Sequence, residues 1–230
     1  MATQTALIIG ASRGLGLGLV REYLGRGWHV VGTVRGPARS PLHDLADLHP
    51  AKLEIETVDI NHPAETDALR ERLSGRDFDL LFVNAGVSND RAETVGQVTD
   101  ESFIRVMVTN ALSPMRVVER FESLVPATGV IALMSSGLGS VANNLDGEWE
   151  VYRASKASLN TLMRSYAARH TGDPRTLLLI APGWVRTDMG GPSALLDVET
   201  SIRGVVDAIT ARTGTAGLRY VNYQGNTVPW

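Results

Sequence analysis

Cysteine is absent from the 230 residues, and lysine occurs only at Lys52 and Lys156. The lack of cysteine excludes disulfides, thiolate metal sites and thiol catalysis. The net charge of -3 argues against general nucleic-acid binding, which needs a basic face. No apolar run approaches the ~20 residues of a membrane span, and the N-terminus lacks the basic and apolar regions of a signal peptide. We therefore predict a soluble, cytoplasmic protein with no nucleic-acid partner and no membrane contact.

The five histidines, at positions 29, 43, 49, 62 and 170, show no ligand spacing such as H-E-x-x-H. We therefore expect no metal site. Hydrophobic residues make up 43% of the chain and charged residues 20%, a balance typical of a folded protein with a large core. The length predicts a single domain spanning residues 1–230.

Short apolar runs alternate with helical patterns along the whole chain. We expect strands at residues 6–9, 28–34, 53–58, 78–83, 129–134, 177–180 and 219–223. This alternation predicts an α/β fold, with a Rossmann-like, doubly wound parallel sheet of about seven strands and helices on both faces. Ligands of such sheets bind outside the carboxyl ends of the strands, so the residues that follow each strand are candidates for a site.

A glycine-rich turn, GASRGLG at residues 10–16, follows the first predicted strand and opens a helix. The backbone N–H groups of such a turn can approach a pyrophosphate, and the helix N-terminus favours its negative charge. The spacing departs from the G-x-G-x-x-G dinucleotide fingerprint. The position directly after a strand is therefore the better evidence for a dinucleotide-binding domain.

The second predicted strand ends at Arg35 instead of an acidic residue that would bind the ribose of NAD. Together with Arg13 in the glycine turn and Arg39 nearby, Arg35 suits the 2′-phosphate of NADP(H). The alternative is that Arg35 and Arg39 are ordinary loop charges of an arginine-rich chain.

Polar or small residues also follow the later strands. Asp59 ends the third strand, where it could accept from an adenine amino group or serve in a turn. The segment Asn84-Ala85-Gly86 is small enough for a flat cofactor ring to approach, and Ser135-Ser136 ends the fifth strand. Asn110 lies inside a long helical pattern at 99–121, where asparagine is mildly unfavourable unless it has a specific role.

Tyr152 and Lys156 are four residues apart and share one face of a predicted helix. An ammonium beside a phenol favours the phenolate and lowers the tyrosine pKa from ~10 toward neutrality, which would make Tyr152 a proton donor and acceptor. The alternative is an exposed lysine on an ordinary amphipathic helix. The other 20 basic residues are arginine, so a lysine here favours the first interpretation.

Together these segments resemble the short-chain dehydrogenase/reductase family from end to end. The matching motifs are GASRGLG at 10–16, Asp59-Ile60, NAG at 84–86, Asn110, the serine pair 135–136, YxxxK at 152–156 and PGWVRTD at 182–188. The segments SSGLGS, EVYRASKASLN and PGWVRTDMGG are more narrowly similar to the C-factor and sniffer-type carbonyl reductases.

The resemblance implies a catalytic set of four residues. Tyr152 would transfer a proton, and Lys156 would bind the nicotinamide ribose and lower the tyrosine pKa. Asn110 would hold a water in a proton relay to Lys156. Ser136 would orient the substrate. The extra loop 141–150, however, places more residues between Ser136 and Tyr152 in the sequence than is usual in the family. Ser135 or Ser140 could therefore contribute instead.

The resemblance also implies a set of cofactor contacts. The cofactor-binding residues would be Gly10, Ser12, Arg13, Gly14, Leu15, Gly16, Arg35, Asp59, Ile60, Asn84, Ala85, Gly86, Tyr152, Lys156, Pro182, Gly183, Val185 and Thr187. The implied activity is NADPH-dependent reduction of a ketone, aldehyde or quinone to an alcohol. The alternative is an NADP(H)-binding regulatory or signalling protein with little turnover. A sugar epimerase or dehydratase usually needs a further substrate domain.

The resemblance extends to the substrate side and to assembly. A short substrate lid is expected at about 188–199, with Trp149 and Trp184 as candidate pocket walls or, alternatively, as packing residues. Relatives commonly form homodimers or homotetramers through the helices that correspond to residues 99–121 and 152–170.

Overall fold

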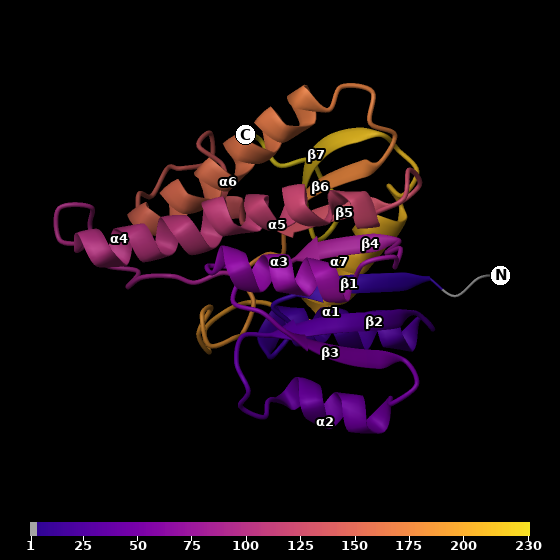
Figure 1. Ribbon diagram of the computed structural model, residues 1–230. Coiled ribbons are helices and arrows are strands. Elements are labelled where there is room, and N and C mark those ends of the chain that lie inside the picture. Colours follow the sequence, from indigo (N-terminus) through magenta and orange to yellow (C-terminus); the bar gives the residue numbers. More distant parts are fainter. Residues whose placement is uncertain (1–3) are drawn as a thin grey trace.

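The computed structural model describes residues 4–230 and is built around one seven-stranded sheet (Figure 1). The strands are β1 (Thr5–Ile9), β2 (His29–Val34), β3 (Leu53–Thr57), β4 (Leu80–Val83), β5 (Val130–Met134), β6 (Thr176–Ala181) and β7 (Gly217–Asn222). Every pairing is parallel, in the order β3-β2-β1-β4-β5-β6-β7. The predicted doubly wound parallel sheet is therefore confirmed.

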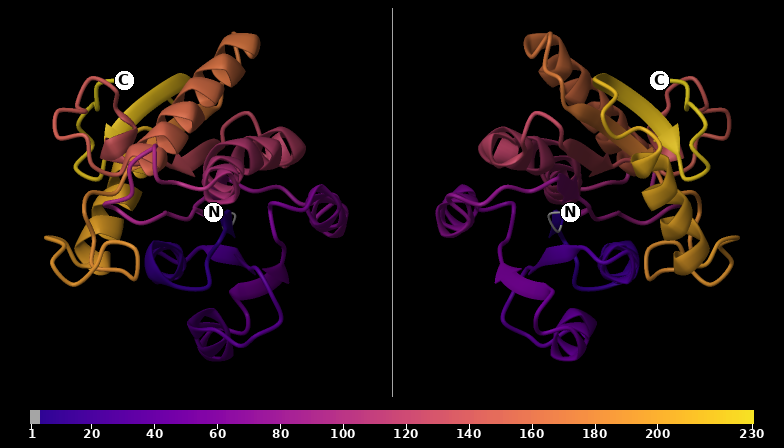
Figure 2. Two further views of the ribbon diagram at one scale, coloured as in Figure 1. Left: turned by 90° about the vertical axis from the view of Figure 1, so that its left-hand side faces the viewer. Right: turned by 90° about the vertical axis from the view of Figure 1, so that its right-hand side faces the viewer.

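Helices cover both faces of the sheet (Figure 2). They are α1 (Gly14–Gly25), α2 (Pro41–Leu48), α3 (Pro63–Arg72), α4 (Asp100–Met107), α5 (Ser113–Phe121), α6 (Glu150–Arg169) and α7 (Val198–Thr210), with 3₁₀ turns at Glu122–Leu124 and Gly137–Gly139. Leu7 and Ile9 of β1 join an apolar cluster with α3, α5 and α6, whereas Ala6 and Ile8 join a second cluster with α1, α2 and α7. Both faces of the strands are therefore buried, which explains why their sequences are continuous apolar runs.

The chain order reverses between β1 and β4, which are neighbours at the centre of the sheet. At such a reversal the connections leave β1 and β4 toward opposite sides, and a crevice opens at the carboxyl ends of the strands. The glycine turn follows β1 and the segment 84–86 follows β4, so both predicted segments meet at this crevice.

The helical pattern expected at 99–121 is not one regular α-helix. A π-helical turn at Val108–Leu112 separates α4 from α5, and the N–H of Ser113 bonds the carbonyl five residues earlier. Pro114 has no N–H to give to the carbonyl of Asn110, so a regular helix could not satisfy that group. The expected helical pattern is confirmed as an unbroken helical run over residues 100–121, which departs from α-helical geometry at this turn. Such turns are frequent at functional sites.

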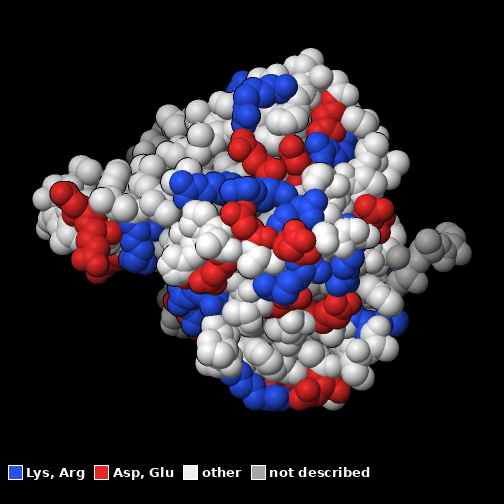
Figure 3. Space-filling model, viewed as in Figure 1, with Lys and Arg blue, Asp and Glu red and all other residues white. Residues whose placement is uncertain are grey.

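Charged side chains of both signs alternate over α3 and α5 on the face shown in Figure 3. Arg120 of α5 pairs with Asp67 of α3 at 3.1 Å, and Arg169 of α6 pairs with Glu119 of α5. Exposed pairs of this kind each contribute about 0–1 kcal/mol, so the helices are held mainly by their buried faces.

Candidate active site

The glycine turn packs so tightly against its surroundings that side chains would not fit at two of its positions. A Cβ at Gly16 would lie 2.1 Å from the carbonyl oxygen of Gly10, and one at Gly10 would lie 2.9 Å from Ala85. The amide of Asn84 donates to the same carbonyl of Gly10 at 2.7 Å. Asn84 therefore holds the turn against the end of β4.

The space beside this turn has the features that a phosphorylated dinucleotide needs. Gly10 and Gly14 have φ angles of 86° and 55°, in the left-handed region that favours glycine. α1 begins at Gly14, so its first N–H groups are available to an anion at this edge. Arg13 and Arg35 are exposed at the same edge. These residues fit a dinucleotide with an extra phosphate.

The other residues predicted near the adenine have side chains that are already paired or buried. Arg39 forms ion pairs with Asp44 at 2.7 Å and Asp47 at 2.5 Å, both on α2, as expected for an ordinary loop charge. The carboxylate of Asp59 accepts from the N–H of Asn61 at 2.9 Å, which is the turn role considered as its alternative. The Ile60 side chain is buried in the core, so only its backbone could contact a ligand.

Tyr152 and Lys156 lie together on α6, as their spacing predicts. The ammonium of Lys156 is 5.8 Å from the centre of the Tyr152 ring and donates to the carbonyl of Met134, at the end of β5, at 2.9 Å. Lys156 is only 3% exposed, so this cation is held inside the protein. The exposed lysine of an ordinary amphipathic helix is therefore excluded.

Burial changes the pKa of both residues. It raises the pKa of Tyr152 to about 12, with the Ser136 hydroxyl acting in the opposite direction, and it lowers the pKa of Lys156 to about 8. The expectation that Lys156 brings the tyrosine pKa toward neutrality was therefore wrong for this structure. Desolvation of the phenol dominates, and the ammonium points to the carbonyl of Met134.

The three candidate serines differ in what their hydroxyls do. Ser135 is buried and donates to Asn160 at 2.7 Å, while Ser140 accepts from the N–H of Asn143 at 3.2 Å. Ser136 accepts from the N–H of Leu138 at 3.1 Å. Of these serines, Ser136 alone is found to act on the pKa of Tyr152, which favours it as the substrate-orienting residue.

Asn110 is completely buried, and its side chain bonds both backbone groups of the loop after β4 and the hydroxyl of Ser155 on α6, to which its amide donates at 2.9 Å. It donates to the carbonyl of Val87 at 2.7 Å and accepts from the N–H of the same residue at 2.8 Å. A Cβ at Gly86 would lie 3.3 Å from the Asn110 side chain and 3.5 Å from the ammonium of Lys156. The segment after β4, the π-turn and the lysine therefore meet at one point.

The segment after β6 is shaped by close contacts with its neighbours. Gly183 has a φ of 84°, and a Cβ there would lie 2.6 Å from Leu196. The carbonyl of Pro182 accepts from Ser201 of α7 at 2.7 Å, and buried Val185 forms a β-bridge with Leu196. This bridge closes the base of the predicted lid, which ends where α7 begins.

The start of the predicted lid also contacts the glycine turn, because Asp188 forms an exposed ion pair with Arg13 at 2.9 Å. The methyl of Thr187 lies 3.7 Å from the position of a Cβ on Gly14, and its hydroxyl accepts from the N–H of Gly190 at 3.1 Å. Trp184 donates to the carbonyl of Gly190 at 2.8 Å and remains 45% exposed. Thr187 thus reaches the glycine turn, whereas Trp184 is fixed by the lid.

The loop 141–150 is fastened to α6 by Arg153, a buried residue that the sequence analysis did not single out. Its guanidinium donates to the carbonyl of Glu148 at 2.6 Å. The next residue, Trp149, has a φ of 65°, and its ring meets the Tyr152 ring edge-on at 5.8 Å. The loop therefore places an aromatic ring directly beside the candidate proton donor.

Two further buried residues of the site were missed by the sequence analysis. Asn160 donates to the carbonyl of Gly139 at 3.1 Å, and Tyr220 of β7 donates its hydroxyl to the carbonyl of Ser136. Asn160 could have been found by its helical spacing from Lys156. Nothing in the local pattern of β7 signals the contact of Tyr220.

Residues 4–230 contain no group of three histidine, aspartate or glutamate side chains that could hold a metal ion. Over the same residues, no helix combines the length and apolar character needed to cross a membrane.

Comparisons with known proteins show the family of this chain. The family model for short chain dehydrogenase matches residues 4–195. The chain is 38% identical to the C-signal protein of Myxococcus xanthus over 157 residues, covering 66% of this chain and 92% of that protein.

Solved structures are similar over the whole chain. A short-chain dehydrogenase/reductase-type protein from Burkholderia multivorans with bound NADP is 55% identical, with a TM-score of 0.98 and full coverage of both chains. A carbonyl reductase from Pseudomonas aeruginosa in complex with NADP is 39% identical, with a TM-score of 0.93 and full coverage of both chains. The chain therefore belongs to the short-chain dehydrogenase/reductase family of oxidoreductases.

Proposed function

We propose that this enzyme is an NADPH-dependent carbonyl reductase that converts a ketone, aldehyde or quinone to an alcohol. The observation that carries the proposal is that Tyr152 and Lys156 lie together at the end of β5, where Lys156 donates to the carbonyl of Met134 two residues before Ser136. The same edge of the sheet holds the glycine turn. The similarity to the carbonyl reductase of Pseudomonas aeruginosa, solved with NADP, supports it.

NADPH would supply the hydride when bound. The backbone of the glycine turn would hold its pyrophosphate, and Arg13 and Arg35 would hold its 2′-phosphate. Thr187, which reaches the turn, and Gly183 would flank the nicotinamide. Gly86 leaves room for the ring next to Lys156.

The hydroxyls of Ser136 and Tyr152 would donate to the substrate oxygen as negative charge develops on it. A phenol with a pKa of about 12 keeps its proton at neutral pH, so Tyr152 is loaded as an acid for reduction. Lys156, with its pKa lowered to about 8, can then return a proton to Tyr152. The carbonyl of Asn110, which Pro114 leaves without its α-helical donor, would hold the water of the relay.

The loop 141–150 and the lid at 188–199 would form the substrate walls. Trp149 meets the Tyr152 ring at 5.8 Å, which places an apolar surface where the substrate would bind. Met189 and Leu195 of the lid are 40% and 79% exposed. An apolar carbonyl compound fits these walls better than a small polar one.

A second candidate function is favoured by the similarity to C-signal. In that case the protein would bind NADP(H) as a regulatory signal, with little turnover. The two functions differ in one measurable respect, which is whether NADPH is consumed when carbonyl compounds are supplied.

Replacing Tyr152 with Phe should separate these functions. In a panel of ketones, aldehydes and quinones, the wild-type protein should oxidise NADPH, and Tyr152→Phe should lower kcat about 10²- to 10⁴-fold because the general acid is removed. The dissociation constant for NADPH should change less than about twofold, since the ring remains. Tight NADPH binding by the wild type with no turnover across the panel would favour the regulatory function.

Replacing Arg13 and Arg35 with Ala should lower coenzyme selectivity. We expect the dissociation constant for NADPH to rise about 10- to 100-fold and that for NADH to stay nearly constant, because only the 2′-phosphate contacts are lost. Fluorescence titration measures both constants. Arg39→Ala is the matched control, since Arg39 lies outside the glycine turn and is held by two carboxylates of α2. Equal losses for both coenzymes would contradict the assignment.

Lys156→Met should stabilise the protein at pH 7 while removing activity. The lowering of the lysine pKa from 10.5 to about 8 corresponds to a folding penalty of about 3 kcal/mol while the lysine is charged in both states. Between pH 8 and 10.5 the folded lysine is neutral and the unfolded one still protonated, so the penalty falls steadily as the pH rises and is gone above pH 10.5. Urea unfolding should therefore show a stability advantage of the variant that narrows toward pH 10.5; a constant advantage would contradict the burial argument.

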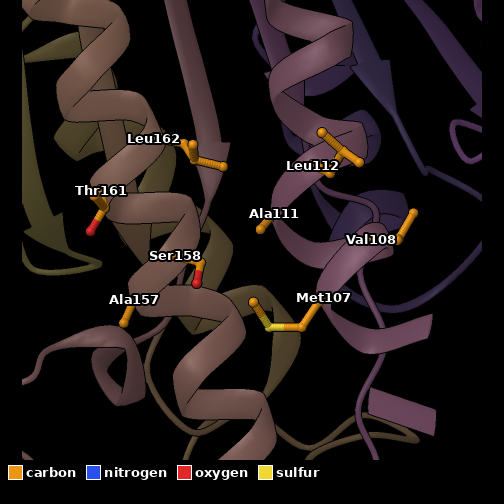
Figure 4. A pocket seen from close by; sticks show the side chains of 8 residues that line it. All are labelled: Met107, Val108, Ala111, Leu112, Ala157, Ser158, Thr161 and Leu162. Carbon is orange, nitrogen blue, oxygen red and sulfur yellow. The ribbon is translucent and has the colours of Figure 1, made fainter. Parts of the chain in front are cut away.

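We also propose that the protein forms a homodimer through α4, α5 and α6, which correspond to the ranges 99–121 and 152–170 through which relatives commonly assemble. A groove of about 530 Å³ lies between the π-turn and α6 (Figure 4). It is lined by Met107, Val108, Ala111, Leu112, Ala157, Ser158, Thr161 and Leu162. Leu112 and Leu162 are each 40% exposed, and Ile104 of α4 is 57% exposed. Such a face is suited to a second copy of the same helices.

Replacing Leu162 with Glu should therefore dissociate the dimer. Light scattering should give a wild-type mass of about twice the chain mass of 24.8 kDa and a variant mass near the single chain, because a carboxylate would be buried at the interface. Leu48→Glu, on an apolar residue of α2 that is 76% exposed, should leave the mass unchanged. A wild-type protein that is monomeric at micromolar concentration would refute the proposal.

A further inference from the structure

Tyr220 of β7 contacts the backbone of Ser136 from 84 positions away in the chain. β6 lies between β5, which ends just before the serine pair, and β7. The side chain of Tyr220 therefore crosses the neighbouring strand to reach the carbonyl of Ser136. Tyr220 is 1% exposed, so both its ring and its hydroxyl are enclosed by protein.

The Ser136 carbonyl accepts two hydrogen bonds, one from Tyr220 and one from the N–H of Gly139 at 2.9 Å. The second bond closes the short 3₁₀ turn that begins after the serine. The first is the tertiary contact that ties this turn to β7. Because the carbonyl and the side chain belong to the same residue, the Tyr220 bond constrains the backbone from which the Ser136 hydroxyl projects, and the N–H of Leu138, which donates to that hydroxyl at 3.1 Å, sets its direction from there.

The chain beyond β7 strengthens this arrangement. The Trp230 ring packs against Tyr220 with centroids 5.4 Å apart, and Arg164 of α6 lies 4.7 Å from the centre of the Trp230 ring. The carbonyl of Trp230 accepts from the N–H of Ala142 at 3.0 Å. Residues 136–142 are thus held at both ends by β7 and the segment that follows it.

We propose that Tyr220 is a positioning residue for carbonyl reduction, which fixes the Ser136 hydroxyl in the direction required for donation to the substrate oxygen. The inference rests on the proposed function of Ser136. A donor must lie about 2.7–3.1 Å from the developing oxyanion, so a small rotation of the Ser136 backbone weakens its contribution.

The test is a double-mutant cycle of Tyr220→Phe with Ser136→Ala. Tyr220→Phe should lower kcat about 5- to 10-fold, as expected for one lost hydrogen bond, with the NADPH dissociation constant changed less than about twofold. In the Ser136→Ala background the same substitution should change kcat less than about twofold, because there is no hydroxyl left to position. An equal loss of kcat in the wild-type and Ser136→Ala backgrounds would overturn the inference. A Tyr220→Phe variant with the kcat of the wild type would also overturn it.

Tyr23→Phe is the matched control. Tyr23 is buried in α1, and its hydroxyl has no hydrogen-bond partner among residues 4–230. Its removal should leave kcat unchanged. If Tyr23→Phe lowers kcat as much as Tyr220→Phe does, the loss reflects general packing and the inference fails.

Hydrogen exchange of the free protein provides a readout that does not depend on turnover. In Tyr220→Phe, amides of residues 136–142 should exchange about 5- to 10-fold faster than in the wild type, with β5 and α6 unchanged. Unchanged exchange in this segment would refute the positioning role. A wild-type protein that reduces no carbonyl compound would instead refute the proposed function, whereas the exchange result would still report on the contact itself.

Discussion

A single buried ammonium links the main parts of the site. Lys156 reaches from α6 to the carbonyl of Met134 at the end of β5, and Gly86 after β4 leaves space beside it. Burial lowers the pKa of this lysine to about 8, so holding the cation in the protein reduces stability at neutral pH. Such a cost is typical of residues kept for function, and the two apolar clusters on either side of the sheet offset it.

Several polar residues of the site serve mainly to shape the backbone. Asn84 fastens the glycine turn to β4 through the carbonyl of Gly10, and Asn110 fastens the loop after β4 through both backbone groups of Val87. Asn160 holds the turn after Ser135 in the same way. These contacts pre-organise the edge of the sheet, so that the hydroxyls and the cofactor-binding groups need little rearrangement when ligands bind.

The two sides of the proposed substrate site are built differently. The loop 141–150 is anchored by the buried Arg153, and it presents Trp149 to the ring of Tyr152. The segment after β6, which we propose as a lid, is joined at its base by the bridge between Val185 and Leu196 and exposes apolar side chains. This difference would give the proposed reductase one fixed aromatic wall and one more open wall, an arrangement suited to apolar carbonyl compounds of varied size.

Local patterns in the chain were sufficient to predict the alternation of strands and helices, the glycine turn and the shared face of Tyr152 and Lys156. Periodicity and short spacings depend on neighbouring residues alone. They predicted each strand to within two residues at either end. They did not predict the π-turn at Asn110, the raised pKa of Tyr152 or the contact of Tyr220 with Ser136. These properties depend on desolvation and on partners up to 84 positions away, which come together when the sheet aligns β5, β6 and β7.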